Sequence, residues 1–132
     1  MRHLETPTRF SYEFMPTSLI PVIPEVSSEK PRFIPIGPLA LPALASHKLR
    51  IMRIAAVFHF AVLCSTMHMA WTRAVCGRLE IRYPYSAKIV FNNFPWPSPT
   101  AQERRAIESA GQSILDSRHA HPHSTLAYLY SP

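Results

Sequence analysis

The sequence predicts an α+β fold, in which short, proline-rich strands are followed by a long buried helix, an extended segment and a second amphipathic helix. Three observations lead to this prediction. Eight of the 14 prolines precede residue 43, none lies between residues 43 and 83, and six follow. An apolar run with helical spacing occupies residues 54–76, and a helix-capping pattern begins at Thr100. Because proline fixes φ and lacks an N–H, the N-terminal third is expected to be extended.

The N-terminal third contains three candidate strands. The runs LIPVIPEV and RFIPI are separated by a Ser-Ser-Glu-Lys-Pro turn, and HKLRIM is the third candidate. In HKLRIM, Leu49 and Ile51 share one face while Lys48 and Arg50 share the other, as the two-residue period of a strand requires. The prolines favour positions at sheet edges.

The strongest predicted element is a single helix over residues 54–76. Its apolar side chains recur at steps of three and four and are expected to form one buried face: Phe60, Cys64, Met67, Trp71 and Ala74. Gly77 follows as a stop signal, and Arg73 and Arg78 suit the negative helix end. Polar residues such as His68 interrupt the run, so we expect a core helix and no membrane span.

The cysteines and the N-terminus favour a cytoplasmic protein. Cys64 and Cys76 both fall in the predicted helix, where twelve residues separate them by about 18 Å, too far for a disulfide. The N-terminal stretch MRHLETPTRF lacks the apolar core of a secretory signal.

The C-terminal part is predicted to alternate extended and helical segments. RLEIRYPYS and KIVFNN have the composition of strands or extended segments, with a bend at Pro84 and Ser86. The second helix begins after Thr100, because TAQE places Glu103 where a capping box requires it. It should end near Arg118, and its expected buried residues are Ala106, Ile107, Ala110 and Ile114.

The stretch NNFPWP raises the question of a catalytic loop. Enzymes that methylate the amino group of adenine or cytosine combine a polar residue, two consecutive prolines and an aromatic residue to hold the flipped base. NNFPWP has no Pro-Pro and has its aromatic in a different place, and none of the three glycines marks a strand-to-helix turn for S-adenosylmethionine. We therefore predict no catalytic and no cofactor-binding residue in this chain, and we expect Phe94 and Trp96 to be packing anchors.

Two other groups of residues are weak candidates for chemistry. Histidines surround a proline in the connector HAHPH, a setting in which they are usually only exposed: His119, His121 and His123. His68 with Cys64 or Ser65 would resemble a base and a nucleophile, but no orienting acid or oxyanion turn accompanies them. We predict neither a metal site nor catalysis there.

The middle of the chain is strongly basic. Residues 30–88 contain nine Lys and Arg side chains and one acid, Glu80, which favours a polyanionic partner such as nucleic acid. In an extended chain, Glu80 and Arg82 would point to the same side. They could then read a C·G pair, with Glu80 accepting from cytosine N4 and Arg82 donating to guanine O6 and N7. The alternative is a surface ion pair worth less than about 1 kcal/mol, which the residues alone favour.

Longer strings carry a resemblance to a known family. IPEVSSEKPRFIPIG, FHFAVLCSTMHMAWTRAVCGRLEIRYPYSAKIVFNNFPWP and AIESAGQSILDSRHAHPHSTLAYLYSP together resemble the C-terminal part of the MmeI-like adenine-specific DNA methyltransferases, single-chain restriction-modification enzymes. The resemblance implies the end of a target-recognition domain over residues 1–52 and a C-terminal helical region over residues 53–132. The catalytic loop and the S-adenosylmethionine site of the family lie upstream and have no counterpart here.

The resemblance also implies roles for individual residues. Family members carry Glu-x-Arg or Lys-x-Asp at Glu80 and Arg82, and the pair changes with one base of the recognition site, which favours base readout. The expected function is DNA target recognition for an S-adenosylmethionine-dependent adenine-N6 methyltransferase. The expected partners are double-stranded DNA, contacted through its backbone, and the upstream methyltransferase domain. The predicted backbone contacts are Lys30, Arg32, Lys48 and Arg50.

Three departures from the family pattern are visible. Pro84 stands where Arg is usual, Ala61 stands where Gly is typical, and RIAAVFHFAV lacks the usual polar helix cap. The family also continues past LYSP with another helix, so we expect a fragment of a larger protein. The alternative function is a non-catalytic remnant or a protein-interaction segment that packs on a partner through Trp71, Phe94 and Trp96.

Overall fold

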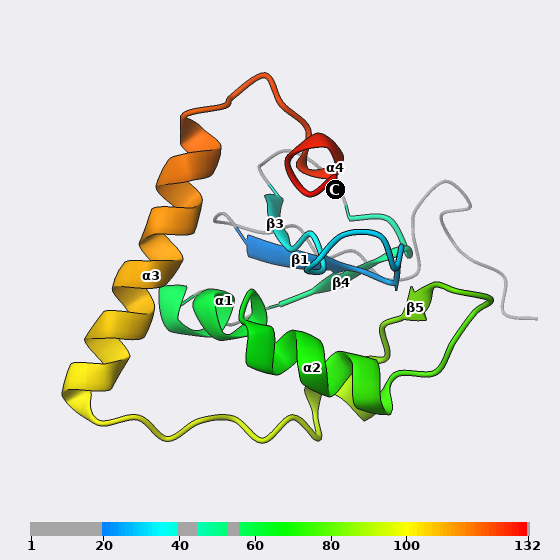
Figure 1. The fold of residues 1–132 in the computed structure, drawn as a ribbon, viewed down its shortest axis with the longest axis horizontal. Coiled ribbons are helices and arrows are strands. Elements are labelled where there is room, and N and C mark those ends of the chain that lie inside the picture. Colours follow the sequence, from blue (N-terminus) through cyan, green and yellow to red (C-terminus); the bar gives the residue numbers. More distant parts are fainter. Residues whose placement is uncertain (1–19, 40–44, 53–55, 132) are drawn as a thin grey trace, which may run out of the picture.

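The computed structural model describes residues 20–39, 45–52 and 56–131. Figure 1 shows the arrangement of the elements. In chain order these are strands β1 (Ile20–Pro24), β2 (Val26–Ser27), β3 (Gly37–Leu39) and β4 (Leu49–Ile51), helices α1 (Val57–Leu63) and α2 (Thr66–Val75), strand β5 (Tyr83–Pro84), the π-helix η1 (Ala87–Phe91), and helices α3 (Ala101–His119) and α4 (Leu126–Leu129). The mixture of small antiparallel sheets and helices confirms the predicted α+β class.

The strands form two small sheets that meet at Glu25. The first sheet has the antiparallel order β3-β1-β4, with Val22 opposite both Gly37 and Ile51, and the second pairs β2 with β5. The backbone N–H of Glu25 donates to the Lys48 carbonyl, and its own carbonyl accepts from the Tyr85 N–H, both at 2.7 Å. The backbone of Glu25 therefore connects the first sheet to the segment that follows β5.

Two of the three predicted strands are confirmed. LIPVIPEV contains β1 and begins β2, and HKLRIM contains β4. The prediction for RFIPI was wrong, because β3 begins only at Gly37. In RFIPI the Ile36 N–H bonds to the Ile34 carbonyl at 2.9 Å, which closes a tight turn around Pro35, and both isoleucines are buried.

The predicted helix over residues 54–76 is broken, so Cys64 and Cys76 do not share a helix. Helix α1 ends at Leu63, and Ser65 begins α2 with extended backbone (φ −81°, ψ 160°). Its hydroxyl accepts from the His68 N–H at 3.2 Å, and such a cap competes with continuation of the helix. Both thiols are free and buried.

The break also changes which residues of this region are buried. Phe60 and Cys64 lie in the core as predicted, but Met67 is 48% exposed and Ala74 is exposed. Because α2 is a new helix, the helical spacing of buried residues does not continue from α1. The buried residues of α2 are His68, Met69 and Thr72. None of the helices in the described part of the chain is both long and apolar enough to cross a membrane.

The prediction of extended structure for KIVFNN was also wrong. Ser86 accepts from the Ile89 N–H at 3.3 Å, and the Asn92 N–H bonds to the Ala87 carbonyl at 2.9 Å, which closes one wide turn of π-helix. The buried member of this turn is Val90, which is fully enclosed. The helical turn capped by Ser86 therefore forms here, although the composition of KIVFNN favours a strand.

The capping box of the last long helix is confirmed. The Thr100 hydroxyl accepts from the Glu103 N–H at 3.3 Å, and the Glu103 carboxylate accepts from the Thr100 N–H at 2.8 Å. Helix α3 ends at His119, one residue beyond the prediction, and runs along one side of the molecule (Figure 1). Of its predicted buried residues, Ile107 and Ile114 are half-buried, while Ala106 and Ala110 are exposed.

Helix α3 approaches α1 closely at Gly111, the one buried residue of α3. A Cβ placed on Gly111 would lie 2.7 Å from the Ala61 Cβ and 3.3 Å from the Val57 carbonyl oxygen. Helix α1 begins without a side-chain cap at Ala56, as the missing polar residue predicts.

The core contains side chains from both halves of the chain. Strand residues Ile23, Ile36 and Met52 belong to the same buried cluster as Phe60 of α1 and Tyr85. This cluster contains residues from both sides of the domain boundary predicted at residue 52. The boundary itself stays a prediction.

A candidate nucleic-acid interface

The segment that carries Glu80 and Arg82 forms a tight hairpin. Leu79 and Arg82 exchange two backbone hydrogen bonds of 3.0 Å, which leaves Glu80 and Ile81 as the two turn residues. Glu80 has a φ of +59°, a conformation that glycine usually supplies in such turns. The expected straight, extended backbone between Glu80 and Arg82 is therefore wrong.

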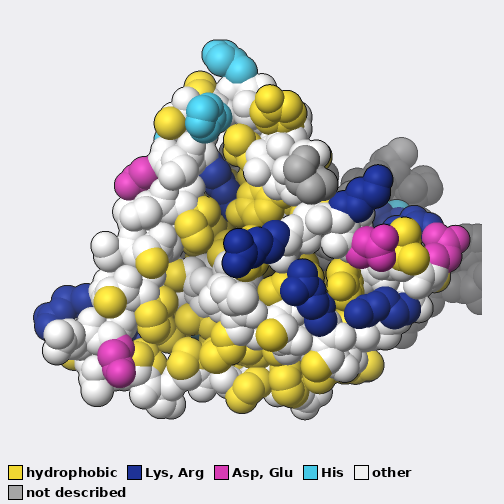
Figure 2. Space-filling model, in the orientation of Figure 1, with side chains coloured by type: hydrophobic (Ala, Val, Ile, Leu, Met, Phe, Trp, Pro, Cys, Tyr) yellow, Lys and Arg dark blue, Asp and Glu magenta, His cyan; other side chains and the backbone are white. Residues whose placement is uncertain are grey.

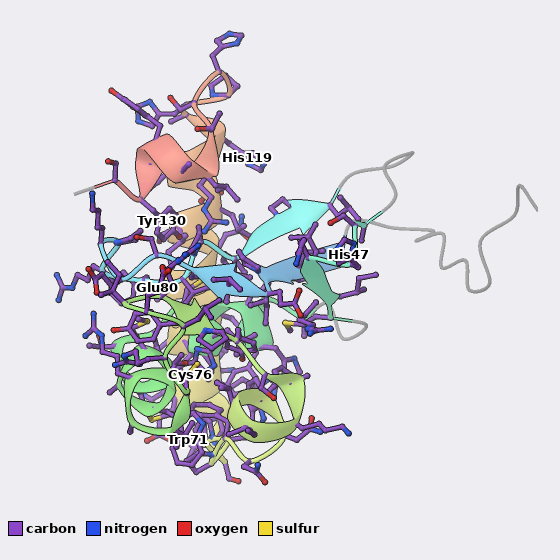
Figure 3. All side chains as sticks on the ribbon, turned by 90° about the vertical axis from the view of Figure 1, so that its right-hand side faces the viewer. His47, Trp71, Cys76, Glu80, His119 and Tyr130 are labelled. Carbon is purple, nitrogen blue, oxygen red and sulfur yellow. The ribbon has the colours of Figure 1, made fainter. Side chains whose placement is uncertain are left out.

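The turn still brings the two charged side chains together at the surface. The Arg82 guanidinium donates to the Glu80 carboxylate, and these side chains are 48% and 70% exposed. Figure 3, which looks at this end of the molecule, shows Glu80 above Cys76 and Trp71. The neighbouring apolar side chains Leu79 and Ile81 are also half-exposed, at 50% and 58%. Charged and apolar groups are therefore both available to a partner at the tip.

Both legs of the hairpin are fixed to the core. The N-terminal leg leaves α2 at Cys76, whose thiol donates to the Pro84 carbonyl of the other leg at 3.0 Å. In the C-terminal leg Tyr83 is buried, and the Arg78 guanidinium lies 4.2 Å from the centre of its ring. Tyr85 is 1% exposed, and its hydroxyl lies 3.0 Å from His68 Nε2. An exposed tip thus stands on a buried base.

Two of the predicted phosphate contacts share a carboxylate, that of Glu25, which no sequence pattern indicated. Arg50 Nη2 lies 2.6 Å from Glu25 Oε1, and Lys48 Nζ lies 4.0 Å from Glu25 Oε2. The backbone of Glu25 also bonds to Tyr85 below the hairpin, so Glu25 connects strand β4 to the hairpin base. No spacing rule could pair Glu25 with Arg50, because the two are 25 residues apart and meet only through sheet pairing.

The other two predicted phosphate contacts lie on the loop after β2. Lys30 and Arg32 are both exposed, and the Arg32 guanidinium lies 5.4 Å from the centre of the Phe33 ring. The Arg32 carbonyl accepts from Arg73 Nη2 of α2 at 3.4 Å. Figure 2 shows Lys and Arg side chains gathered on the right-hand half of this face, near the end of α2 and β5 in Figure 1.

The aromatic residues of NNFPWP belong to the core. Phe94 is 4% exposed, and its ring centre lies 5.1 Å from that of Trp96, 5.0 Å from that of His68 and 6.2 Å from that of Trp71. The Trp71 indole N–H donates to the Val90 carbonyl at 2.9 Å. The prediction that Phe94 and Trp96 are packing anchors is confirmed; Phe94 is buried, whereas Trp71 and Trp96 are half-buried.

The other residues considered for catalysis or metal binding are the Cys64 thiol, the Ser65 hydroxyl and the histidines of HAHPH. Burial raises the pKa of the Cys64 thiol to about 11, against a smaller lowering by Arg118, which keeps the thiol protonated at neutral pH. The Ser65 hydroxyl is used as a helix cap. His121 and His123 are exposed, and within residues 20–39, 45–52 and 56–131 no cluster of three His, Cys, Asp or Glu side chains could hold a metal ion.

Comparisons with known proteins match this architecture to one family. Residues 2–98 match the family model of the MmeI target recognition domain. DNA methyltransferase A of Bacillus subtilis (strain 168) is 37% identical over 127 residues, which cover 96% of this chain and 14% of that protein. The structure of the Type IIL restriction-modification enzyme MmeI in complex with DNA is 43% identical with a TM-score of 0.88, and the match covers 96% of this chain and 17% of that one. The chain therefore spans a small part of the length of either relative.

Proposed function

Because the chain belongs to the family of MmeI target recognition domains, we propose that it recognises double-stranded DNA on behalf of a methyltransferase domain in the same longer polypeptide. The observation that carries this proposal is the exposed Glu80–Arg82 pair at the tip of a hairpin whose base is buried. The major groove admits a two-stranded β-ribbon, and a tight turn between two chain segments is no wider. The relative of known structure was solved with DNA.

The chemistry of the two side chains suits a C·G pair. The Glu80 carboxylate only accepts hydrogen bonds, as the cytosine N4 amino group requires, and the Arg82 guanidinium only donates, as guanine O6 and N7 require. On DNA the two groups would exchange their mutual ion pair for base contacts. An exposed pair of this kind is worth less than about 1 kcal/mol, so this exchange costs little.

Basic side chains around the hairpin would contact phosphates. We assign this role to Lys30 and Arg32 first, because both are exposed and no carboxylate lies against them in the described structure. Lys48 and Arg50 are the second pair, and Arg50 must share its charge between a phosphate and Glu25. Loss of either pair should weaken binding to all sequences and reduce its salt dependence, since phosphate contacts carry no base information.

Methyl transfer itself would take place outside this chain. S-adenosylmethionine is the methyl donor expected of the whole enzyme, with the N6 amino group of adenine as the expected acceptor. The residues here do not fit that cofactor, because Gly37 lies in β3 against Leu126, Gly77 follows a helix, and Gly111 is packed against α1. We therefore propose that the cofactor binds in another part of the longer polypeptide. Its two free, buried thiols accord with the reducing cytoplasm in which such an enzyme would act.

The test is a charge exchange at the hairpin in the full-length enzyme. Glu80→Lys combined with Arg82→Asp should change the preferred base at one position of the methylated site, as read by sequencing methylated DNA. The control exchanges another exposed pair, Arg104 and Glu108 of α3, which lie 3.1 Å apart and far from the hairpin in sequence. The control should methylate the original site. An active hairpin variant that also keeps the original site would contradict base readout by this pair.

A further inference from the structure

One fully buried polar group near the hairpin is the imidazole of His68. His68 is 1% exposed, with Nδ1 3.0 Å from the Leu63 carbonyl oxygen and Nε2 3.0 Å from the Tyr85 hydroxyl. A carbonyl can only accept, so Nδ1 carries the proton and donates to Leu63. Nε2 is then the acceptor for the Tyr85 hydroxyl. Both ring nitrogens have partners, as a buried site requires.

The position of His68 connects segments that are distant in the sequence. Its ring centre lies 5.0 Å from that of Phe94, with the two rings nearly perpendicular at 84°. The strings MHMAW, YPYS and NNFPWP therefore meet at one buried point through His68, Tyr85 and Phe94. Nothing in the proposed contacts to DNA accounts for this convergence.

Tyr85 connects His68 to the C-terminal leg of the hairpin. It follows Arg82 by three residues, and its backbone N–H is fixed by the Glu25 carbonyl at 2.7 Å. The N-terminal leg of the hairpin continues from α2, the helix that contains His68. One leg is thus attached to α2 by the chain itself. The other is attached by the hydrogen bond between Tyr85 and His68, in addition to the bond from the Cys76 thiol at the end of α2 to the Pro84 carbonyl.

We propose that His68 and Tyr85 are positioning residues for base readout, because their hydrogen bond fixes the hairpin on α2 and so aims Glu80 and Arg82. This inference rests on the proposed function of the hairpin. A two-stranded hairpin is only marginally stable by itself, whereas base contacts require side chains held within a fraction of an ångström. Removal of the Tyr85 hydroxyl leaves Nε2 buried without a partner, which favours movement of the ring and of the leg attached to it.

The experiment measures discrimination between two DNA duplexes by the full-length enzyme. One duplex carries the recognised site, and the other has the C·G pair at the position read by the hairpin replaced. Tyr85→Phe should reduce the ratio of the two affinities roughly tenfold, within the range that one misplaced bidentate base contact accounts for. Thr72→Val is the matched control, because it removes the buried bond from Thr72 Oγ1 to the His68 carbonyl (2.8 Å), a bond that involves neither Tyr85 nor the imidazole ring. The control should keep the ratio.

A mutant cycle separates positioning from general stability. In an enzyme with Glu80→Ala and Arg82→Ala, adding Tyr85→Phe should not reduce the ratio further, because no readout pair remains to be aimed. A further loss in that background, or no loss in the otherwise unaltered enzyme, would overturn the inference and leave the proposed function standing. If the double alanine variant itself keeps full discrimination, the proposed function fails, and the inference fails with it.

A second pair of variants covers the case in which Tyr85→Phe does not fold. His68→Gln keeps a donor and an acceptor in the buried site, whereas His68→Ala removes both. His68→Gln should therefore discriminate between the duplexes better than His68→Ala. Equal discrimination by the two variants would count against a positioning role.

Discussion

The tip of the hairpin and the site of His68 hold their polar side chains in opposite ways. The side chains of Glu80 and Arg82 are 70% and 48% exposed and bond to each other, with Glu80 in a left-handed backbone conformation. His68 is 1% exposed and bonds to groups of two other segments. A partner can displace the first arrangement at little cost, whereas the second can change only if the core opens. Direct contact with a partner and stability of the core therefore depend on different, neighbouring residues.

This difference predicts that substitutions in the core and at the tip have different effects. Changes in the core should alter the free energy of unfolding and leave the preferred DNA base unchanged. Changes at the tip should alter the preferred base at little cost in stability. His68 and Tyr85 are the expected exceptions, because they belong to the core and support the tip.

The largest effect on stability is expected at Phe94. Phe94→Ala empties the centre of the aromatic cluster and should lower the free energy of unfolding by about 3–5 kcal/mol, measured by chemical denaturation of the chain. Ile89→Ala is the control, because Ile89 is 53% exposed, and it should change the value by less than about 0.5 kcal/mol. Equal costs for the two variants would show that the cluster does not stabilise the fold.

Acidification should have the next largest effect. Burial lowers the pKa of His68 to about 4 from its ordinary 6.5, so the unfolded chain binds a proton at pH values where the folded chain does not. Stability should therefore fall as the pH drops from about 6.5 to about 4, by about 3 kcal/mol from this group, and its contribution should be constant below that range. The measurement is the unfolding free energy across this range. His68→Gln should remove most of the slope, and an unchanged slope would assign it to other groups.

The local signals in the sequence were sufficient for parts of this core and insufficient for others. The capping box at Thr100 predicted the start of α3 because both of its hydrogen bonds join residues three apart. The break at Ser65 was missed because the apolar spacing continues across it, although Ser65 is itself a good cap. The π-helix was missed because KIVF has the β-branched composition of a strand.

The candidate site shows the same division. Residue types and charge correctly singled out Glu80 and Arg82 as neighbours, but a glutamate gives no signal for a turn residue with positive φ, so an extended backbone was predicted. Glu25 and Tyr85 were missed because their roles arise from strand pairing and burial. Neither relationship follows from spacing along the chain.

A smaller effect is expected where α3 meets α1. Gly111→Ala places a Cβ 2.7 Å from that of Ala61, so the two helices must separate. We expect a loss of about 1–3 kcal/mol in unfolding free energy, reduced by the better helix propensity of alanine. Adding Ala61→Gly should restore part of the loss in a thermal or chemical denaturation experiment, because it returns the space. Failure of this rescue would mean that the strain comes from Val57.

The smallest effect on stability, with a large effect on recognition, is expected for Glu80→Gly. Glycine adopts a φ of +59° without the steric cost that glutamate bears, so the free energy of unfolding should stay the same or rise by at most about 1 kcal/mol. The substitution also removes the carboxylate that would accept from cytosine N4, so preference for the C·G pair should fall in a binding assay with paired duplexes. Glu80→Val is the counterpart, because it removes the same carboxylate but places a β-branched residue where φ is positive. Equal loss of preference with opposite changes in stability would show that the tip is built for recognition at a cost to the fold. A marked destabilisation by glycine would instead make the Glu80–Arg82 pair part of the structural support.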